Sequence, residues 1–295
     1  MTAAHAPVLL AETVALLQPS RGGVFVDCTL GLGGHTAALL EAGASRVIGL
    51  DRDPRALELA RERLSAWGDR VELVHADYRE LPAVLAGRGI TAIDGALADL
   101  GVSSMQLDEP ARGFSFRADG PLDMRMDTTR GETAAEMIAT VDEQALADVI
   151  YQFGEERKSR RVARAIVEAR EEAPIETTAR LASIVRRAAG GGTYQRIDPA
   201  TRTFQALRIW VNRELDGLDT FVVDAVRALR EGGRLVVIAF HSLEDRIVKH
   251  TLRMLERGEG LVRVLTKKPV TAADAELAGN PRSRSAKLRA VERVS

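Results

Sequence analysis

A glycine-rich turn between two apolar runs is the feature of this sequence with the clearest chemical meaning. Residues 24–27 form an apolar run that ends in an acid, and Gly31, Gly33 and Gly34 follow it. A second apolar run ends in Asp51, about 20 residues after the first of these glycines. This order is typical of a strand–turn–helix–strand unit that binds a nucleoside cofactor, because glycine lets the backbone approach a ligand closely. Asp51 is then placed to accept hydrogen bonds from two ribose hydroxyl groups.

The spacing within the turn distinguishes between two classes of cofactor. A dinucleotide site needs a third small residue at position 36, where helix and strand pack closely, and the chain has Thr36 there. The pattern Asp27-x-x-x-Gly31-x-Gly33-Gly34 is instead typical of enzymes that bind S-adenosylmethionine, which has no pyrophosphate. We therefore expect S-adenosylmethionine here, the alternative being an ordinary turn of an α/β domain without a ligand.

The composition is that of a folded protein that does not enter a membrane. The 295 residues suffice for one large or two modest domains, and 45% of them are hydrophobic and 28% charged. Cys28 is the only cysteine, which excludes an intrachain disulfide and fits a reducing cytoplasm. No apolar run approaches the length of a membrane span, and no group of His, Asp and Glu has metal-ligand spacing. We expect a cytoplasmic protein with no metal.

The net charge of −1 argues against binding nucleic acid through bulk charge. Basic residues are nevertheless clustered at Arg157, Lys158, Arg160, Arg161 and Arg164, and again at Arg282, Arg284, Lys287 and Arg289. A local basic face of this kind can contact an RNA backbone. A solvated helix face explains each cluster equally well.

The order of predicted elements gives the domain organisation. Short apolar runs predict strands over 24–27, 47–51, 71–75 and 93–99, with helices between them. The chain is then loop-like over about 109–130, and the pattern over about 133–189 predicts helices alone. Two capping boxes occur there, at Thr133–Glu136 and Thr140–Glu143. An apolar stripe follows at Leu181, Ile184, Val185 and Ala188. A long helix over about 203–230 precedes strands over 234–240, 261–266 and 286–292. We predict a Rossmann-like α/β domain from residues 1–110 and 205–295, and an inserted all-helical domain over 111–204.

Seven further motifs occur in order along nearly the whole chain. They are His5-x-Pro-Val-Leu-Leu10, residues 99–108, Arg112-Gly-Phe-Ser-Phe116, residues 120–127, Phe204-Gln-Ala-Leu-Arg-Ile209, Phe240-His-Ser-Leu-Glu-Asp-Arg246 and Asn280-Pro-Arg-Ser-Arg-Ser285. Together they resemble the bacterial 16S ribosomal RNA cytosine-N4-methyltransferase family, called MraW or RsmH. One departure is Met105, where the family usually has proline. The helical insertion matches the family more loosely than the sheet domain.

The resemblance implies an S-adenosylmethionine-dependent enzyme with a class I methyltransferase fold and a helical substrate-recognition domain. Its substrate would be a cytidine N4 in the decoding region of 16S ribosomal RNA, within the small ribosomal subunit. By correspondence with the family, the cofactor contacts fall on Gly33, Gly34, His35, Asp51, Tyr78, Asp99 and Gln106.

Chemical reasoning gives some of these residues specific roles. Tyr78 can stack beside adenine, and Asp77 can accept from the adenine amine. Asp99 ends a strand at the sheet edge where ligands bind, and it is either a general base for the cytosine amine or only a cofactor ligand. The tentative substrate contacts are Arg112, Phe114, Phe116, His241 and Arg246, the two phenylalanines as stacking partners for the base.

Other interpretations remain open at this stage. Two of the tentative substrate contacts have structural alternatives. A loop phenylalanine can pack in the core instead of stacking on a base. The residues after Phe240 can instead form a helix start that Ser242 caps, with Asp245 at its third position. A methyltransferase of DNA or of a small molecule, a dehydrogenase, and a ribosome-assembly factor without catalysis are alternative functions. The sequence does not decide between naked RNA and an assembled subunit as substrate, and it leaves the oligomeric state open.

Overall fold

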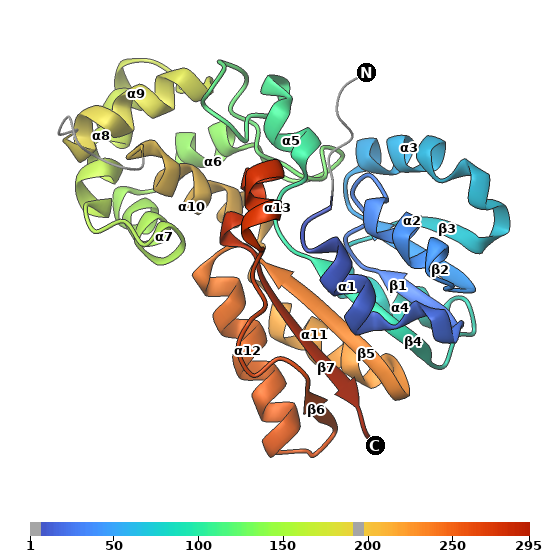
Figure 1. Ribbon diagram of the computed structural model, residues 1–295. Coiled ribbons are helices and arrows are strands. Elements are labelled where there is room, and N and C mark those ends of the chain that lie inside the picture. The colour runs from blue at the N-terminus through green and yellow to red at the C-terminus, as the bar shows by residue number, and fades with distance from the viewer. Residues whose placement is uncertain (1–6, 191–197) are drawn as a thin grey trace. The chain divides into compact units, whose positions relative to one another are not determined.

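The computed structural model describes residues 7–190 and 198–295 (Figure 1). His5, from the first motif, lies outside the described residues. The chain divides into two compact units. The sheet unit comprises Met1–Gly101 and Leu215–Ser295, and the helical unit comprises Val102–Glu214.

The sheet unit contains a seven-stranded sheet with the strand order β3-β2-β1-β4-β5-β7-β6. The strands are β1 (Val24–Asp27), β2 (Arg46–Asp51), β3 (Val71–His75), β4 (Ile93–Asp99), β5 (Leu229–Ala239), β6 (Val262–Val264) and β7 (Lys287–Arg293). Strands β1 to β5 pair in parallel, whereas β7 is antiparallel to both β5 and β6. The prediction of a Rossmann-like α/β sheet is therefore confirmed.

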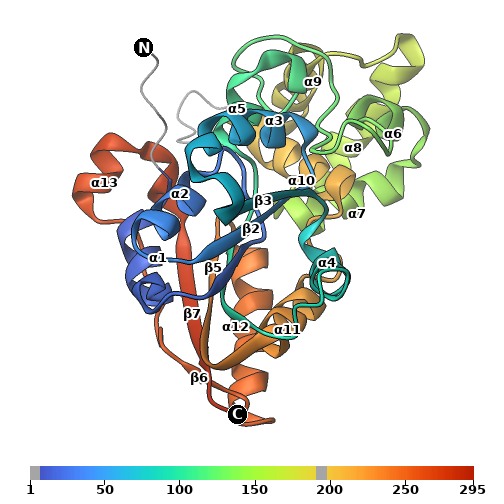
Figure 2. The same ribbon diagram turned by 90° about the vertical axis from the view of Figure 1, so that its right-hand side faces the viewer.

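Helices cover both faces of this sheet, as Figure 2 shows. They are α1 (Leu10–Leu17), α2 (Gly34–Glu41), α3 (Pro54–Arg63), α4 (Leu81–Ala86), α11 (Leu218–Ala228) and α12 (Ser242–Arg257). The sheet unit also contains the short helix α13 (Asp274–Gly279). Alternate strand residues point to opposite faces. Thus Val26 and Ile48 pack with residues of α4, α11 and α12, whereas Phe25 and Val47 pack with residues of α1 and α2. Burial on both faces explains why these strands read as continuous apolar runs.

The helical unit has a core of its own. It comprises α5 (Ser104–Asp108), α6 (Ala134–Thr140), α7 (Glu143–Gly154), α8 (Ser159–Glu172), α9 (Thr178–Ala189) and α10 (Ala200–Asn212). The predicted apolar stripe of α9 is buried in that core. Among the described residues we find no helix whose length and apolar character would let it cross a membrane.

Two local predictions were wrong, and both errors concern helix ends. The Thr133–Glu136 capping box is confirmed, but Thr140 ends α6, and Asp142 caps α7 by accepting from the Ala145 amide. The single helix predicted over 203–230 is two helices, because Arg213 and Gly217 adopt left-handed backbone angles between α10 and α11.

The helical unit extends beyond the predicted 111–204 at both ends. Its boundaries lie at Val102 and Glu214, because Val102, Leu107 and Leu207 all pack in its apolar core. These side chains therefore belong to the inserted unit, although the segments that carry them border the sheet strands in sequence.

Candidate active site

Three neighbouring parallel strands each end in an aspartate at the carboxyl edge of the sheet. Asp27 ends β1, Asp51 ends β2 and Asp99 ends β4. Ligands of open α/β sheets bind outside this edge. The site is therefore built around the three carboxyl groups and the turn that follows β1.

The glycine-rich turn places its backbone in conformations that other residues rarely adopt. Gly31 has φ +52° and Gly33 has φ +75°. A Cβ atom on Gly33 would lie 2.6 Å from Leu64 Cδ1, whereas one on Gly31 would meet no described atom within 4 Å. Gly34 begins α2, whose first amides have no partner within the helix. The turn therefore offers open space beside Gly31 and amides suited to a carboxylate.

Asp51 fastens the turn to the second strand. Its Oδ2 accepts from the Gly31 amide at 2.7 Å, and its Oδ1 accepts from the Asp53 amide at 2.8 Å. Burial raises the pKa of Asp51 to about 6, although these two hydrogen bonds oppose the rise. Each carboxylate oxygen has a further lone pair, so Asp51 can still accept from ribose hydroxyls.

Asp27 holds α2 against β1. The Thr36 hydroxyl donates to Asp27 Oδ2 at 2.8 Å, and the Thr29 amide donates to Oδ1 at 3.3 Å. Burial raises the pKa of Asp27 to about 6 despite these bonds. From the sequence, Thr36 was only an argument against a dinucleotide cofactor. Its pairing with an acid nine positions earlier was not anticipated.

Asp99 has the least satisfied carboxyl group of the three. Its Oδ1 is buried and has no hydrogen-bond partner within the described chain, while its amide donates to Thr29 Oγ1 at 2.6 Å. Burial raises the pKa of Asp99 well above its usual range, and the charges of Asp27 and Glu244 raise it further. An acceptor held without a partner in this position is suited to a donor group on a ligand.

His35, the second residue of α2, lies beside Asp99. Its ring is buried, with Nε2 at 3.1 Å from the Val8 carbonyl and Nδ1 at 3.8 Å from Asp99 Oδ2. Burial lowers the pKa of His35 to about 4, so the ring is neutral at pH 7. The Val8 carbonyl can only accept, so Nε2 carries the hydrogen and the Nδ1 lone pair faces Asp99. Its predicted contact with the cofactor stays a prediction.

Tyr78 and Asp77 follow β3. The Tyr78 ring is buried and lies 4.6 Å from the Phe221 ring, centroid to centroid. Although burial opposes it, hydrogen bonds from Arg79 and the charge of Arg52 hold the pKa of Asp77 below its usual range. Because Arg79 Nε and Nη2 each lie 2.7 Å from an Asp77 oxygen, we now assign Asp77 to this ion pair rather than to adenine.

His241 caps the helix that follows β5. Its Nδ1 accepts from the Glu244 amide at 3.4 Å, and Glu244 Oε2 accepts from the Phe240 amide at 2.9 Å. The cap is therefore one residue earlier than the alternative with Ser242, and Asp245 instead pairs with Arg289 at 2.6 Å. His241 serves the helix start, and its predicted substrate contact stays a prediction, as does that of the exposed Arg246.

The predicted site residues of the helical unit mostly maintain that unit. Gln106 Oε1 accepts from the Ser103 amide at 2.9 Å in a capping box of α5. Arg112 is buried, and its Nη2 donates to the carbonyls of Arg125 at 2.9 Å and Met126 at 3.0 Å. Arg112 therefore stabilises this unit, and its predicted substrate contact stays a prediction.

The two loop phenylalanines differ in exposure. Phe114 is 7% exposed and belongs to the apolar core of the helical unit. Phe116 is partly exposed and packs edge-on against Phe204 with ring centroids 4.8 Å apart. Stacking on a base stays a prediction for both residues, and the greater exposure of the Phe116 ring favours Phe116.

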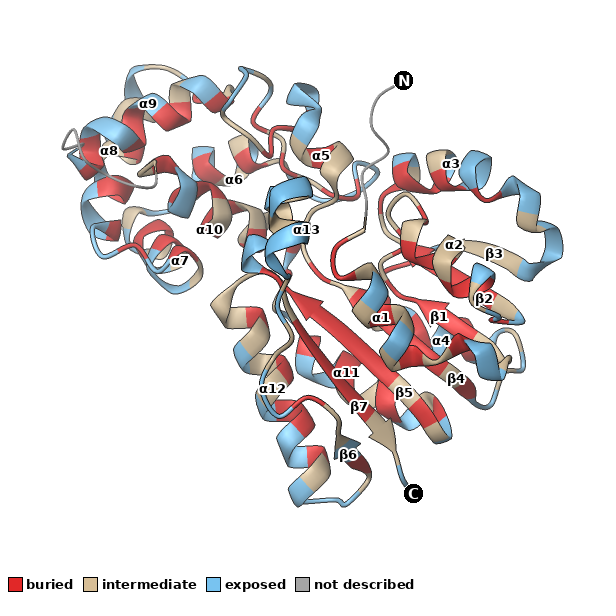
Figure 3. Cartoon of the chain, in the orientation of Figure 1, coloured by how far each residue is buried: buried red, intermediate tan, exposed pale blue. Residues whose placement is uncertain are grey.

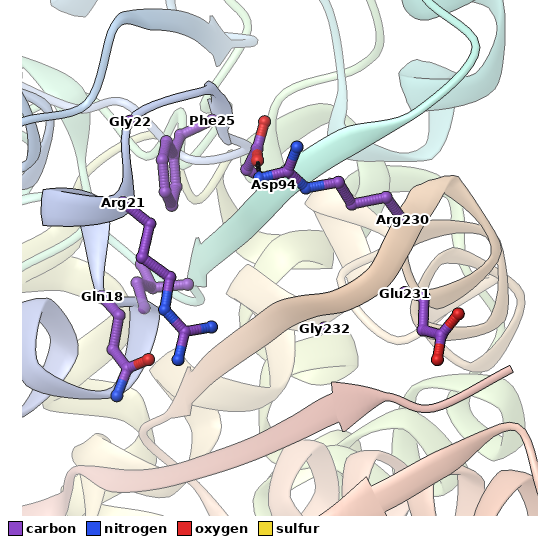
Figure 4. Close-up of a pocket in the computed structure, with 9 residues that line it drawn as sticks. Gln18, Arg21, Gly22, Phe25, Asp94, Arg230, Glu231 and Gly232 are labelled. Atoms are coloured by element: carbon purple, nitrogen blue, oxygen red, sulfur yellow. Dashed lines mark ion pairs between the residues drawn. The ribbon is translucent and has the colours of Figure 1, made fainter.

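A pocket of about 300 Å³ lies at the other edge of the same sheet (Figure 4). Phe25, Asp94 and Gly232 line it from the amino-terminal parts of β1, β4 and β5, and Arg230 points across it toward Asp94. Ligands of parallel sheets bind at the carboxyl edge. We therefore do not assign this pocket to the cofactor.

Comparison with known proteins identifies the family. A model described as the MraW methylase family matches residues 2–294. The chain belongs to this family. It is 57% identical over 290 residues to the protein named Ribosomal RNA small subunit methyltransferase H of Sorangium cellulosum, covering 98% of this chain and 91% of that one. It is 50% identical over 311 residues to the protein of the same name from Geobacter sulfurreducens, covering all of both chains.

S-adenosylmethionine is the cofactor of this MraW-family chain, and the sheet unit fits it. Asp51 has acceptor capacity for ribose hydroxyls, Gly31 borders open space, and Asp99 Oδ1 has no partner in the described part of the chain. These features lie at the ends of neighbouring strands, where one extended ligand can meet all of them.

Proposed function

We propose that this chain transfers a methyl group from S-adenosylmethionine to the exocyclic N4 of a cytidine in the decoding region of 16S ribosomal RNA. Membership of the MraW methylase family and the names of its relatives support an RNA substrate. The observation that carries the amine chemistry is Asp99 Oδ1, a buried acceptor without a partner among the described residues.

The cofactor contacts divide among three places on the sheet edge. Asp51 accepts from the ribose hydroxyls, and the amides of Gly33, Gly34 and His35 receive the carboxylate at the start of α2. Tyr78 borders the adenine. The family correspondence also implies a cofactor contact for Gln106, which stays a prediction.

The chemistry needs a positioned amine more than a strong base. When bound, S-adenosylmethionine supplies an electrophilic methyl carbon attached to a sulfonium. The lone pair of the cytosine N4 is delocalised into the ring, and a hydrogen bond from N4–H to Asp99 Oδ1 helps turn the amine out of conjugation. Asp99 would accept the proton that N4 loses on gaining the methyl group, which leaves a neutral thioether in place of the sulfonium of the cofactor.

Burial of Asp99 favours this step. A carboxylate whose pKa is raised holds the transferred proton more firmly than an ordinary aspartate. Orientation of the two reactants contributes more, since proximity can lower a barrier by roughly 7–11 kcal/mol.

The helical unit is the proposed docking element for the ribosomal particle. Its exposed Arg157, Arg160 and Arg161 lie at and before the start of α8. Because the whole chain has a net charge of −1, attraction to RNA must come from such local groups.

Methyl transfer to isolated small subunits tests the proposal. The protein is incubated with methyl-labelled S-adenosylmethionine and subunits that lack the modification, and the RNA is digested to nucleosides. We expect label in N4-methylcytidine. Label in another nucleoside would contradict the N4 assignment. Intact cofactor binding without labelled RNA would contradict the RNA substrate and favour DNA, a small molecule or a non-catalytic role in assembly.

A further inference from the structure

The exposed face of α12 carries five basic residues and one exposed apolar residue, Met254. The five basic residues lie on one side of the helix, because most of them are three or four positions apart. They are Arg246, Lys249, His250, Arg253 and Arg257. We call these five residues the basic stripe. All are exposed except Lys249, which is half-buried.

The opposite face of α12 is fixed to the sheet. Val248, Leu252 and Leu255 are buried in the core with residues of α11 and the strands. The basic stripe consequently points to solvent, and Figure 3 shows exposed positions on successive turns of this helix. A helix that lies on a membrane needs a free apolar face, which α12 does not have.

In the described part of the chain, the acids of α12 form no ion pair with Lys249, Arg253 or Arg257. Glu244 is buried in the helix cap, Asp245 pairs with Arg289, and Glu256 Oε1 accepts from the Val264 amide at 2.8 Å. Within residues 7–190 and 198–295, Lys249 and Arg253 have no ion-pair partner, and neither does Arg257.

This imbalance is local. The chain as a whole has 41 Lys and Arg against 42 Asp and Glu. Some exposed arginines elsewhere in the sheet unit have nearby carboxylates, such as Arg55 with Glu58 at 2.8 Å and Arg227 with Glu259 at 3.5 Å. A surface of mixed sign would place acids among the cations of the stripe, and none is there among its five positions.

We propose that the basic stripe binds the phosphate backbone of the RNA beside the target nucleotide. The inference rests on the proposed function and adds a second contact, on the sheet unit itself. Strands β4 and β5 pair through Asp99 and Ile238, so α12 begins at the same sheet edge as Asp99. From Arg246 to Arg257 the stripe extends for roughly 17 Å away from that edge, which is long enough for several successive phosphates.

Paired double variants test the stripe in the full-length protein. Arg253→Ala/Arg257→Ala removes two exposed charges and keeps a good helix former at both positions. Arg21→Ala/Arg61→Ala removes two exposed charges of the sheet unit outside α12 and serves as the matched control. Binding to small ribosomal subunits is measured by co-sedimentation across a range of salt concentrations, separately from methyl transfer. The second stripe variant, Arg253→Gln/Arg257→Gln, also removes both charges but keeps longer side chains than alanine does.

We expect the stripe variants to weaken subunit binding roughly 3- to 30-fold near 0.15 M salt and to lower the salt slope by about 1.5, as two lost phosphate contacts require. Cofactor affinity should not change, and the control should bind like the unmodified protein. Stripe variants that bind as tightly as the control, with the same salt slope, would overturn the proposal. Unmodified protein that binds subunits but transfers no methyl group would contradict the proposed function alone.

Discussion

At the scale of single residues, the carboxylate of Asp51 has both a structural role and a binding role. Its carboxylate holds the Gly31 amide and retains acceptor capacity for a ribose. We predict that Asp51→Ala weakens S-adenosylmethionine binding by roughly 1–3 kcal/mol, about 5- to 150-fold, because charged hydrogen bonds are lost. Calorimetric titration measures this, with exposed Asp69→Ala as control. Unchanged affinity would remove Asp51 from the ribose contact.

Cofactor affinity should also depend on pH through Asp51. Its pKa is raised to about 6 in the free protein, and the ionised form is the one that accepts from two hydroxyls. Binding of the cofactor therefore releases a proton below pH 6. We predict that affinity strengthens as the pH rises from 5 to 7 and then levels off. Asp51→Asn cannot titrate and should show a flatter profile, and an unaltered profile would contradict the assignment.

Two substitutions of Asp99 distinguish its role in orienting the amine from its role in accepting a proton. Asp99→Ala should lower kcat by roughly 10²-fold or more, since the amine loses both its acceptor and its base. Asp99→Asn keeps an oxygen acceptor but cannot take the proton, so we predict a smaller loss of kcat than in Asp99→Ala. Single-turnover labelling of RNA measures both variants. Near-normal turnover of Asp99→Ala would exclude Asp99 from the chemistry.

At the scale of elements, the link between α2 and β1 depends on one hydroxyl. Thr36→Val keeps the side-chain shape but leaves Asp27 Oδ2 without its donor. We predict a loss of roughly 1–3 kcal/mol in the free energy of unfolding, measured with denaturant. Because the pKa of Asp27 is about 6, the loss should be larger at pH 8, where the carboxylate is charged, than at pH 5. Thr36→Ser retains the hydroxyl and should be close to the unmodified protein.

The elements that could be predicted from sequence are those fixed by apolar patterning. Buried parallel strands gave continuous apolar runs, so β1 to β4 lie where they were expected. Helix ends depend on single backbone angles instead. The break after α10 was missed because its left-handed residue is Arg213, which carries no turn signal, although Gly217 did. His241 was missed as a cap because capping is usually done by Ser, Thr, Asp or Asn.

At the scale of the whole molecule, sequence motifs located the site better than they assigned its roles. Asp51 and Asp99 stand at the carboxyl edge of the sheet, where strand order alone places ligands. Motif residues of the helical unit were harder to interpret. Arg112 and Phe114 belong to one of the motifs that carry the family resemblance, yet they hold the helical unit together. A motif marks residues needed for folding and for binding alike, and the contacts of each side chain in the structure separate the two better than its motif does.

A nearly neutral protein that acts on RNA must concentrate its cations where the RNA lies. The α8 arginines offer a second test of this on the helical unit, because Arg157, Arg160 and Arg161 are all exposed. We predict that changing the three to alanine weakens binding to small subunits and lowers its salt dependence, with no change in cofactor affinity. The same variant is compared on naked 16S ribosomal RNA. A defect on assembled subunits alone would show that the helical unit recognises the particle, a defect on both would show backbone contact, and no defect on either would leave these arginines as a solvated helix face.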